Sequence, residues 1–393
     1  MSIAASPHLP RRKLPLPHRA RGDAAHYNND SVKKGTVLLS SLSLPILVPI
    51  FVAAAAAVWI AGIKLSDTTD VLSERFGLGQ ALGGLILLAI ATNLPEIAIT
   101  SSAALRQNLG IATGNILGGI AIQTVVLVAL DAFGVRGRYP LTYRAASLAL
   151  VLEGVLVIAV LTVAIMGTQL PPSLIFERLA PADLSIAALW VAGIWLIGKA
   201  RTDLPWQEKG NAPEGQKDPR GAARTKKKQD AEDKGVSTTR TILLFAVSAT
   251  VTLAAGVALE ASGDNIAGQV GMSGVLFGST FLAAATALPE VSTGLASVKL
   301  GDYQLSVSDI FGGNAFLPVL FLLASLLSGQ AALPQAQNTD IYLTGLGALL
   351  TSVYLYGLIF RPRRRVLRMG IDSLVVLVIY GLGIAGLVAI AYG

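Results

Sequence analysis

The chain has 393 residues, of which 53% are hydrophobic and 14% are charged, and its mean hydropathy is +0.61. This composition lies outside the range of soluble globular proteins and indicates a polytopic membrane protein. Cysteine is absent and only three His occur, which excludes disulfides and thiolate metal sites and argues against a His-based transition-metal centre. The net charge of +7 comes from basic residues in a tail and in loops, as in membrane proteins, and does not indicate nucleic-acid binding.

The apolar segments predict an all-α integral membrane protein with about ten transmembrane helices. The Pro- and Arg-rich residues 1–37 come first and predict a disordered basic tail, without an apolar core of signal-peptide length. Each following span needs about 20 mostly apolar residues. Candidate spans lie near 38–63, 78–105, 109–130, 145–167, 183–199, 241–261, 270–298, 304–328, 341–360 and 371–392. These spans form two groups of five, in residues 38–200 and 241–393.

The two groups are separated by residues 201–240, which contain Lys226-Lys227-Lys228, several Gly and Pro, and mixed charges. This composition predicts a flexible linker. The arginines of the short loops lie on the same side of the membrane as this linker, which places the linker in the cytoplasm. In this orientation the basic tail lies outside the cell, which contradicts the excess of Lys and Arg expected on the cytoplasmic side. The sequence therefore does not decide on which side of the membrane the tail lies.

One segment of the sequence occurs twice. Residues 91–96 read Ala-Thr-Asn-Leu-Pro-Glu, and residues 285–290 read Ala-Thr-Ala-Leu-Pro-Glu, at an offset of 194 residues. The match continues, because Ile116-Leu117-Gly118-Gly119 aligns with Ile310-Phe311-Gly312-Gly313. The copies fall in the second and seventh spans, an odd number of spans apart, so they enter the membrane from opposite sides. This arrangement predicts two inverted five-helix repeats with a site near the midplane.

Each copy brings oxygen ligands into the membrane. A carboxylate in a membrane span is costly and is by default a functional hypothesis. The neighbouring proline breaks the helical hydrogen-bond ladder and frees backbone carbonyls. Glu96 and Glu290, with the hydroxyls of Thr92 and Thr286 one turn earlier, predict an all-oxygen cage. Such a cage suits a hard cation such as Ca²⁺, which takes 6–8 oxygen ligands.

Polar residues on the following helices extend this set. Asn115 and Asp309 each follow their Glu by 19 residues. The predicted cation ligands are therefore Glu96, Glu290, Thr92, Thr286, Asn93, Asn115, Asp309, Asn314 and Gln123, with Ser306 and Ser308 as further candidates. Glu153, inside the fourth span, is a proton site or an inter-helix hydrogen-bond partner, and the second interpretation is favoured. Glu260 and Asp264 are expected at the membrane interface.

The two segments resemble the α-repeats of the cation/Ca²⁺ exchanger superfamily, and the Na⁺/Ca²⁺ exchangers in particular. The pattern of that family is Gly-Thr-Ser-Leu-Pro-Glu, followed on the next helix by Gly-Asn-x-x-Gly-Ser-Asn. This chain keeps the pattern at 92–96, 114–119, 286–290 and 308–314. It departs by replacing Ser with Asn93, Ala287, Gly119 and Gly313, and it has Leu317 where the first repeat has Gln123.

The resemblance implies a secondary antiporter that exchanges Ca²⁺ for Na⁺ by alternating access. A gate formed by the first and sixth spans would slide across a core formed by the repeats. The linker has no room for folded Ca²⁺-sensing domains, which points to the simpler prokaryotic type in the cytoplasmic (inner) membrane. Several side-chain oxygens of the Na⁺ sites are missing while Asp309 adds a carboxylate, so H⁺ is the alternative counter-ion.

Two other classes of protein are less favoured by the sequence. A channel or sensor that merely binds a cation is less favoured, because channels typically use pore rings built by symmetric oligomers. A membrane enzyme has no nucleophile–base pair or His-rich motif to support it. The predicted partners are inorganic cations and the lipid bilayer. No cofactor, nucleic acid or obligate protein partner is expected.

Overall fold

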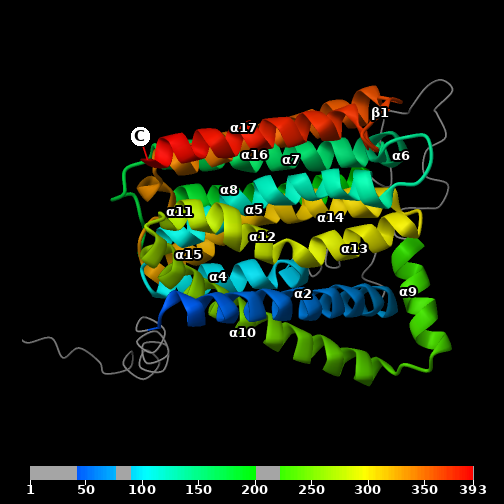
Figure 1. Cartoon of the computed structure of the whole chain (residues 1–393), viewed down its shortest axis with the longest axis horizontal. Coiled ribbons are helices and arrows are strands. Elements are labelled where there is room, and N and C mark those ends of the chain that lie inside the picture. The colour runs from blue at the N-terminus through cyan, green and yellow to red at the C-terminus, as the bar shows by residue number, and fades with distance from the viewer. Residues whose placement is uncertain (1–41, 77–89, 201–221, 393) are drawn as a thin grey trace, which may run out of the picture. The chain divides into compact units, whose positions relative to one another are not determined.

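The computed structural model describes residues 42–76, 90–200 and 222–392, and Figure 1 shows the arrangement of their helices. The chain divides into two units, Met1–Ser41 and Leu42–Gly393, and every described residue belongs to the second. The predicted basic tail and the start of the second predicted span therefore lie outside the described residues.

The described parts of the first half and of the linker contain six helices of two turns or more. These are α2 (Leu44–Arg75), α4 (Leu94–Leu105), α5 (Leu109–Ala129), α7 (Leu148–Thr168), α8 (Pro181–Ala200) and α9 (Ala222–Asp233). The π-helical turn η1 (Leu130–Gly134) continues α5, and the short α6 (Leu141–Ala145) follows it.

The second half begins with α10 (Thr238–Val270). It continues through α11 (Gly274–Phe277), η2 (Gly278–Leu282), α12 (Ala283–Thr286), α13 (Leu288–Lys299), α14 (Tyr303–Phe316), η3 (Leu317–Val319), α15 (Leu320–Ser328), η4 (Leu333–Gln335), α16 (Asn338–Phe360) and α17 (Ile371–Tyr392). Strands β1 (Arg365–Val366) and β2 (Met369–Gly370) form an antiparallel hairpin between α16 and α17.

The all-helical membrane fold is confirmed by these elements. Within the described ranges, eight helices are long and apolar enough to cross a membrane, or nine if the bent run Gly274–Thr286 plus Leu288–Lys299 counts as one span. The predicted span 78–105 is described only from residue 90, so the count of ten stays a prediction. The β1–β2 hairpin departs from the all-α expectation. Its turn uses positive φ at Leu367 (52°) and Arg368 (70°), where a two-residue turn more often carries Asn or Gly.

Residues 201–221 of the predicted linker lie outside the described residues, and the part that is described begins with a helix. Residues 222–233 form α9, and the Ala, Lys, Gln and Glu residues in this segment are strong helix formers. In Figure 1, α9 stands at one end of the long helices, next to the end of α2. Ion pairs from Arg224 and Lys227 to Asp70 hold it against α2.

The helices α2 and α10 form an antiparallel pair. Near one end, Arg75 Nη2 donates to the Val236 carbonyl at 2.8 Å. At the other end, Gln269 Nε2 donates to the Leu42 carbonyl at 2.8 Å. The two helices have 32 and 33 residues, more than the roughly 20 that a span requires. Their ends can therefore project beyond the apolar part of the bilayer.

Each helix of this pair packs against the repeated motif of the other half. A Cβ built at Gly62 of α2 would lie 2.6 Å from Pro289 Cγ, and one built at Gly256 of α10 would lie 3.0 Å from the Pro95 carbonyl oxygen. The two glycines are 194 residues apart, as are the two prolines. The absence of a side chain at Gly62 and Gly256 thus allows reciprocal close contact between the halves.

Helix α5 occupies the centre of the fold, with 78% of its apolar window buried. It approaches η2 so closely that a Cβ at Gly118 would lie 2.2 Å from the Ser279 Cα. Such an approach requires glycine, since the neighbouring atoms are backbone and cannot move cheaply.

This contact predicts that Gly118→Ala destabilises the protein. We expect the free energy of unfolding to fall by roughly 1–3 kcal/mol, the usual cost of overpacking, and the midpoint of thermal unfolding in detergent to fall with it. Gly345→Ala in α16 is the matched control, because a Cβ there meets nothing within 4 Å and alanine favours a helix. Equal midpoints for the two variants would contradict the packing account.

Candidate cation site

Both copies of the motif break a helix at the same place. Residues 90–92 are helical, a turn follows at Asn93, and α4 begins at Leu94. In the second copy α12 ends at Thr286 and α13 begins at Leu288, with a bend of 42°. Pro95 and Pro289 stand in the first turn of the new helices, where proline is well tolerated because that N–H lacks an intrahelical acceptor.

The two new helices run toward opposite ends of α5. Helix α4 ends beside the start of α5, where the Asn108 N–H donates to the Ala103 carbonyl at 2.9 Å. Helix α13 ends beside the far end of η1, since a Cβ at Gly134 would lie 3.0 Å from Val298 Cγ1. The breaks thus lie between these ends, in the interior of the helical unit.

The two carboxylates stand in the first turns of these helices, where the positive end of the helix dipole favours negative charge. Glu96 is fully buried, and Glu290 is half-buried. Glu290 lies close enough to Glu96 and to Asp309 for their charges to interact. Among the described residues, neither oxygen of Glu96 has a hydrogen-bond partner of normal geometry, and neither does Glu290 Oε2. Two acidic groups thus lie together in the interior with little to balance them.

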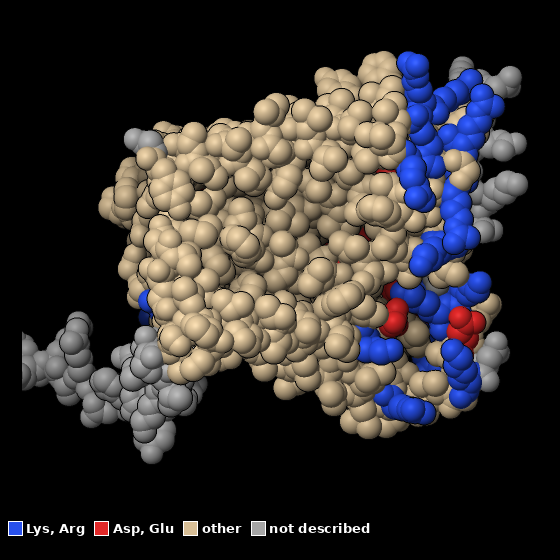
Figure 2. All heavy atoms as spheres, in the orientation of Figure 1, with Lys and Arg blue, Asp and Glu red and all other residues tan. Residues whose placement is uncertain are grey.

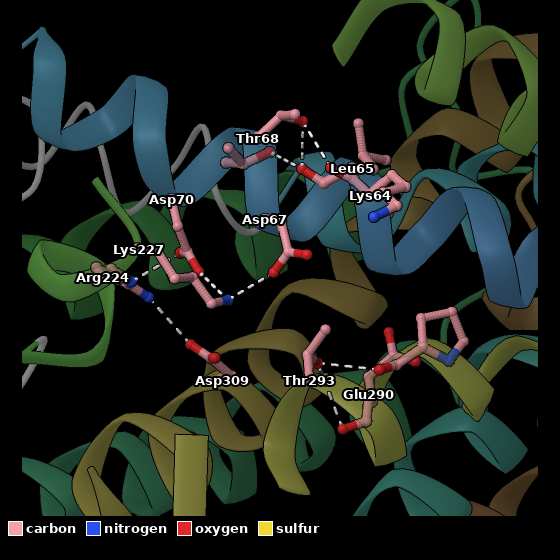
Figure 3. A network of polar contacts seen from close by, with 12 residues as sticks. Lys64, Leu65, Asp67, Thr68, Asp70, Arg224, Lys227, Glu290, Thr293 and Asp309 are labelled. Atoms are coloured by element: carbon pink, nitrogen blue, oxygen red, sulfur yellow. Dashed lines mark hydrogen bonds and ion pairs between the residues drawn. The ribbon is translucent and has the colours of Figure 1, made fainter. Parts of the chain in front are cut away.

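A cavity of about 90 Å³ lies beside Glu290. Five of the predicted ligands line it, together with further polar residues and with Arg224 of α9. The predicted ligands at the cavity are Thr92, Asn93, Gln123, Glu290 and Asp309, and the additional polar residues are Ser66, Glu153, Thr293, Ser306 and Ser308. Figure 3 shows Glu290 and Thr293 on α13 and Asp309 on α14, facing α2. Carboxylate, hydroxyl and amide oxygens are the ligands of hard cations.

The other four predicted ligands are buried and do not line this cavity. The Thr286 hydroxyl faces the Glu96 carboxylate. Asn115 is fully buried, and neither its Oδ1 nor its Nδ2 has a hydrogen-bond partner in the described parts of the chain. Asn314 Nδ2 donates to Thr124 Oγ1 at 3.0 Å, which joins α14 to α5. Asn314 thus acts as a contact between helices.

Gly313 has a positional role at the cavity. A Cβ built there would lie 3.2 Å from Gln123 Oε1 and 3.6 Å from Asn93 Nδ2. The family pattern has Ser at this position. Here the missing side chain of Gly313 leaves room for the carboxamides of Gln123 and Asn93. The amides of Gln123 and Asn93 replace a missing hydroxyl near the same point.

Sequence reasoning missed or misplaced several charged groups. Glu153 lines the cavity, and the expectation that it is an inter-helix hydrogen-bond partner stays a prediction. Glu260, which is expected at the membrane interface, is fully buried within the protein, and α10 continues for ten residues beyond it. It accepts a hydrogen bond from Ser102 Oγ at 2.7 Å and lies 3.5 Å from Arg106 Nη1. Asp264, the other residue expected at the membrane interface, accepts a hydrogen bond from Asn108 Nδ2 at 2.7 Å.

Arg224 and Asp70 were not singled out from the sequence at all. Arg224 is one of several basic residues in the linker, and Asp70 follows an apolar stretch with other charges. A charge-rich segment after a span usually indicates a solvated helix end, so the sequence carries no signal for their approach to the cavity.

The charge distribution on the surface is uneven. Figure 2 shows Lys and Arg side chains gathered over the end that carries α9 and β1, beside a broad belt without charged side chains. Within the described ranges, no three Asp, Glu, His or Cys side chains gather closely enough to form a compact metal centre. Cation binding at this site would therefore depend on hydroxyl, amide and carbonyl oxygens as well as carboxylates.

Comparison with known proteins agrees with this geometry. The chain is 24% identical over 278 residues to inner membrane protein YrbG of Escherichia coli (strain K12), which covers 70% of this chain and 78% of that protein. Its fold is similar to that of the H⁺/Ca²⁺ exchanger CAX, with a TM-score of 0.61, 14% identity, and coverage of 92% and 94% of the two chains. It is also similar to the sodium-calcium exchanger NCX_Mj, with a TM-score of 0.56, 15% identity, and coverage of 87% and 99%.

The profile of sodium/calcium exchanger proteins matches residues 46–197 and 240–389. The two matched segments contain the two Leu-Pro-Glu motifs and leave out most of the linker. Because this match spans both halves and more than half of the sequence, the chain belongs to the sodium/calcium exchanger protein family.

Proposed function

We propose that this protein is a secondary antiporter of the inner membrane that exchanges Ca²⁺ for Na⁺ by alternating access. The observation that carries the proposal is the meeting of Glu96 and Glu290, each at a helix break, beside an oxygen-lined cavity. Two neighbouring carboxylates, three of whose four oxygens lack a hydrogen-bond partner of normal geometry among the described residues, are costly in a membrane interior. A divalent cation bound between them offsets that cost, which is the behaviour required of a transported substrate.

The ligand roles follow from position. Glu96 and Glu290 are proposed as the central ligands. Thr92, Asn93 and Gln123 complete the shell from the cavity side, and Thr286 completes it next to Glu96. Asn314 joins α14 to α5 through its Nδ2, whereas the Oδ1 atoms of Asn314 and Asn115 have no partner among the described residues, so we keep both as proposed ligands.

We further propose that residues 38–200 and 241–393 are inverted repeats joined by a cytoplasmic linker at 201–240. The reciprocal contacts Gly62–Pro289 and Gly256–Pro95 support this, as do the opposite directions of α4 and α13 relative to α5. The basic surface beside α9 supports a cytoplasmic position for the linker. In this arrangement α2 and α10 form the gate, and they slide over the motif prolines through their glycines.

H⁺ is the alternative counter-ion, and Asp309 is the specific observation in its favour. Its carboxylate lines the cavity near Glu290, at the position where the first repeat has Asn115. Three neighbouring carboxylates in a site of low polarity can hold protons in place of a metal ion. The solved structures with a similar fold include both an H⁺/Ca²⁺ exchanger and a sodium-calcium exchanger.

Transport by the purified protein in liposomes tests the function. We expect ⁴⁵Ca²⁺ uptake driven by an outward Na⁺ gradient, and we expect Glu290→Gln to reduce it more than about 100-fold. Loss of a ligand should exceed the roughly 10–100-fold effect of a second-shell change. Glu177→Gln, an exposed loop variant, is the control that should retain uptake. If well-folded wild-type protein moved no Ca²⁺ under either a Na⁺ or a pH gradient, the Ca²⁺ assignment would be wrong.

The counter-ion is decided by Asp309→Asn, which gives the second repeat the amide of the first. If Na⁺ is the counter-ion, Na⁺-driven uptake should change less than about threefold, because an amide oxygen still coordinates. If H⁺ is the counter-ion, uptake driven by a pH gradient should fall to the level of empty liposomes, because the amide cannot take up a proton. Both gradients are applied to the same vesicle preparation. Loss of uptake under both gradients would instead make Asp309 an essential Ca²⁺ ligand.

A further inference from the structure

The linker helix α9 reaches the cation cavity with one basic side chain. Arg224 Nε lies 3.0 Å from Asp70 Oδ1 on α2, and Arg224 Nη2 lies 3.1 Å from Asp309 Oδ1 on α14. One guanidinium therefore bridges a helix of the proposed gate and a proposed ligand of the core (Figure 3). The contact with Asp309 is also a hydrogen bond, donated by Arg224 Nη2, whereas the contact with Asp70 is an ion pair in which Nε forms no hydrogen bond with any described residue.

A second basic residue supports the first from one turn further along α9. Lys227 Nζ lies 2.9 Å from Asp67 Oδ1 and 2.8 Å from Asp70 Oδ2. Residues three apart on a helix share a face, so Arg224 and Lys227 both point to α2. Their neighbour Lys226 is exposed and lies in none of the ion pairs that the structure forms between described residues.

Burial distinguishes Arg224 from an ordinary surface arginine. Its relative exposure is 9%, and it forms part of the cavity wall. Burial alone would lower the pKa of Arg224, but Asp70 and then Asp309 outweigh it and raise the pKa above its ordinary value. The same balance holds for Lys227, whose pKa is raised by Asp70 and Asp67. Both groups therefore stay charged and act as fixed cations.

The Asp309 side chain is 30% exposed and the Asp70 side chain 7%. The exposed part of Asp309 faces the cavity, where a transported cation would bind. A guanidinium and a metal ion cannot both use the same carboxylate oxygen at full strength. The guanidinium of Arg224 thus places a positive charge of the protein next to Asp309 at the cavity wall.

We propose that Arg224 is a tethered counter-cation that closes the linker-side mouth of the cavity by bridging Asp70 to Asp309. A cation that arrives from that side must displace Arg224, and its displacement separates α2 from α14. This inference rests on the proposed function in one respect, namely that Asp309 belongs to the cation site. It adds to that function a competitor for the transported cation, namely Arg224 of the linker. This competitor would lower the apparent affinity for the cation on the linker side of the membrane only.

Thiol labelling tests closure without using transport. The chain has no cysteine, so Ser308→Cys, at the cavity wall, introduces a single thiol. A small cationic methanethiosulfonate should label this thiol about tenfold faster when Arg224→Gln is also present. Such an effect lies between those of exposed and buried ion pairs. Lys226→Gln removes the same charge from the exposed face of α9 and should leave the labelling rate unchanged.

A second variant guards against loss of folding. Arg224→Lys keeps the charge but offers one ammonium instead of a fork, so it should give an intermediate rate. Elution as a single species by size exclusion is required of every variant. Labelling rates of Arg224→Gln and Arg224→Lys equal to that of Lys226→Gln would overturn the proposal.

Transport then separates this inference from the proposed function. In liposomes with the linker side accessible, Arg224→Gln should lower the Ca²⁺ concentration for half-maximal uptake about tenfold, and Lys226→Gln should not. If wild-type protein transports Ca²⁺ but Arg224→Gln changes neither labelling nor half-saturation, the tethered cation is refuted and the antiporter stands. If no Ca²⁺ moves while Arg224→Gln still speeds labelling, closure by Arg224 stands and the Ca²⁺ assignment fails.

Discussion

The fold is organised around two carboxylates that lie in an apolar interior. Glu96 and Glu290 can be placed there because each follows a proline that ends one helix and begins another, so each stands at the positive end of a helix dipole. The halves must then approach closely enough to bring the two breaks together. Glycines make that approach possible, with Gly62 against Pro289 and Gly256 against Pro95. The site and the packing of the halves thus depend on the same interruption of the helices.

Much of this could be predicted from the sequence, because the information is local or repeated. Hydropathy located the spans within a few residues for α7, α8 and α17, and the in-register copies of Leu-Pro-Glu located both helix breaks. Five predicted ligands line one cavity. Helix α2 was harder, since its polar end continues to Arg75 beyond the apolar window that hydropathy detects. The same limitation applies to α10, which continues from Glu260 to Val270, beyond the apolar window.

Tertiary contacts of charged residues were beyond the sequence. Glu153 lies in a predicted helix in which its neighbours in the sequence are apolar. The hydrophobic periodicity therefore does not predict that Glu153 lines the same cavity as Gln123 and Asp309. Arg224 belongs to a linker whose composition indicates a solvated chain, and its role comes from pairing with Asp70, a residue more than 150 positions earlier. Such a pairing is set by where α9 docks. Local composition, which governs helix propensity, does not determine it.

The two sides of the site are closed by different chemistry, and this difference bears on the direction of transport. On the linker side Arg224 lies against Asp309 and Asp70, so the contact there uses a carboxylate that lines the cation cavity. Near the far ends of α4 and α10, Glu260 is held by Ser102 and Arg106, away from the proposed ligands. Closure by Arg224 on the linker side would therefore compete with a cation for Asp309. If Arg224 acts as proposed, the apparent affinity for a cation is lower on the linker side than on the opposite side, because Arg224 replaces the departing ion at Asp309.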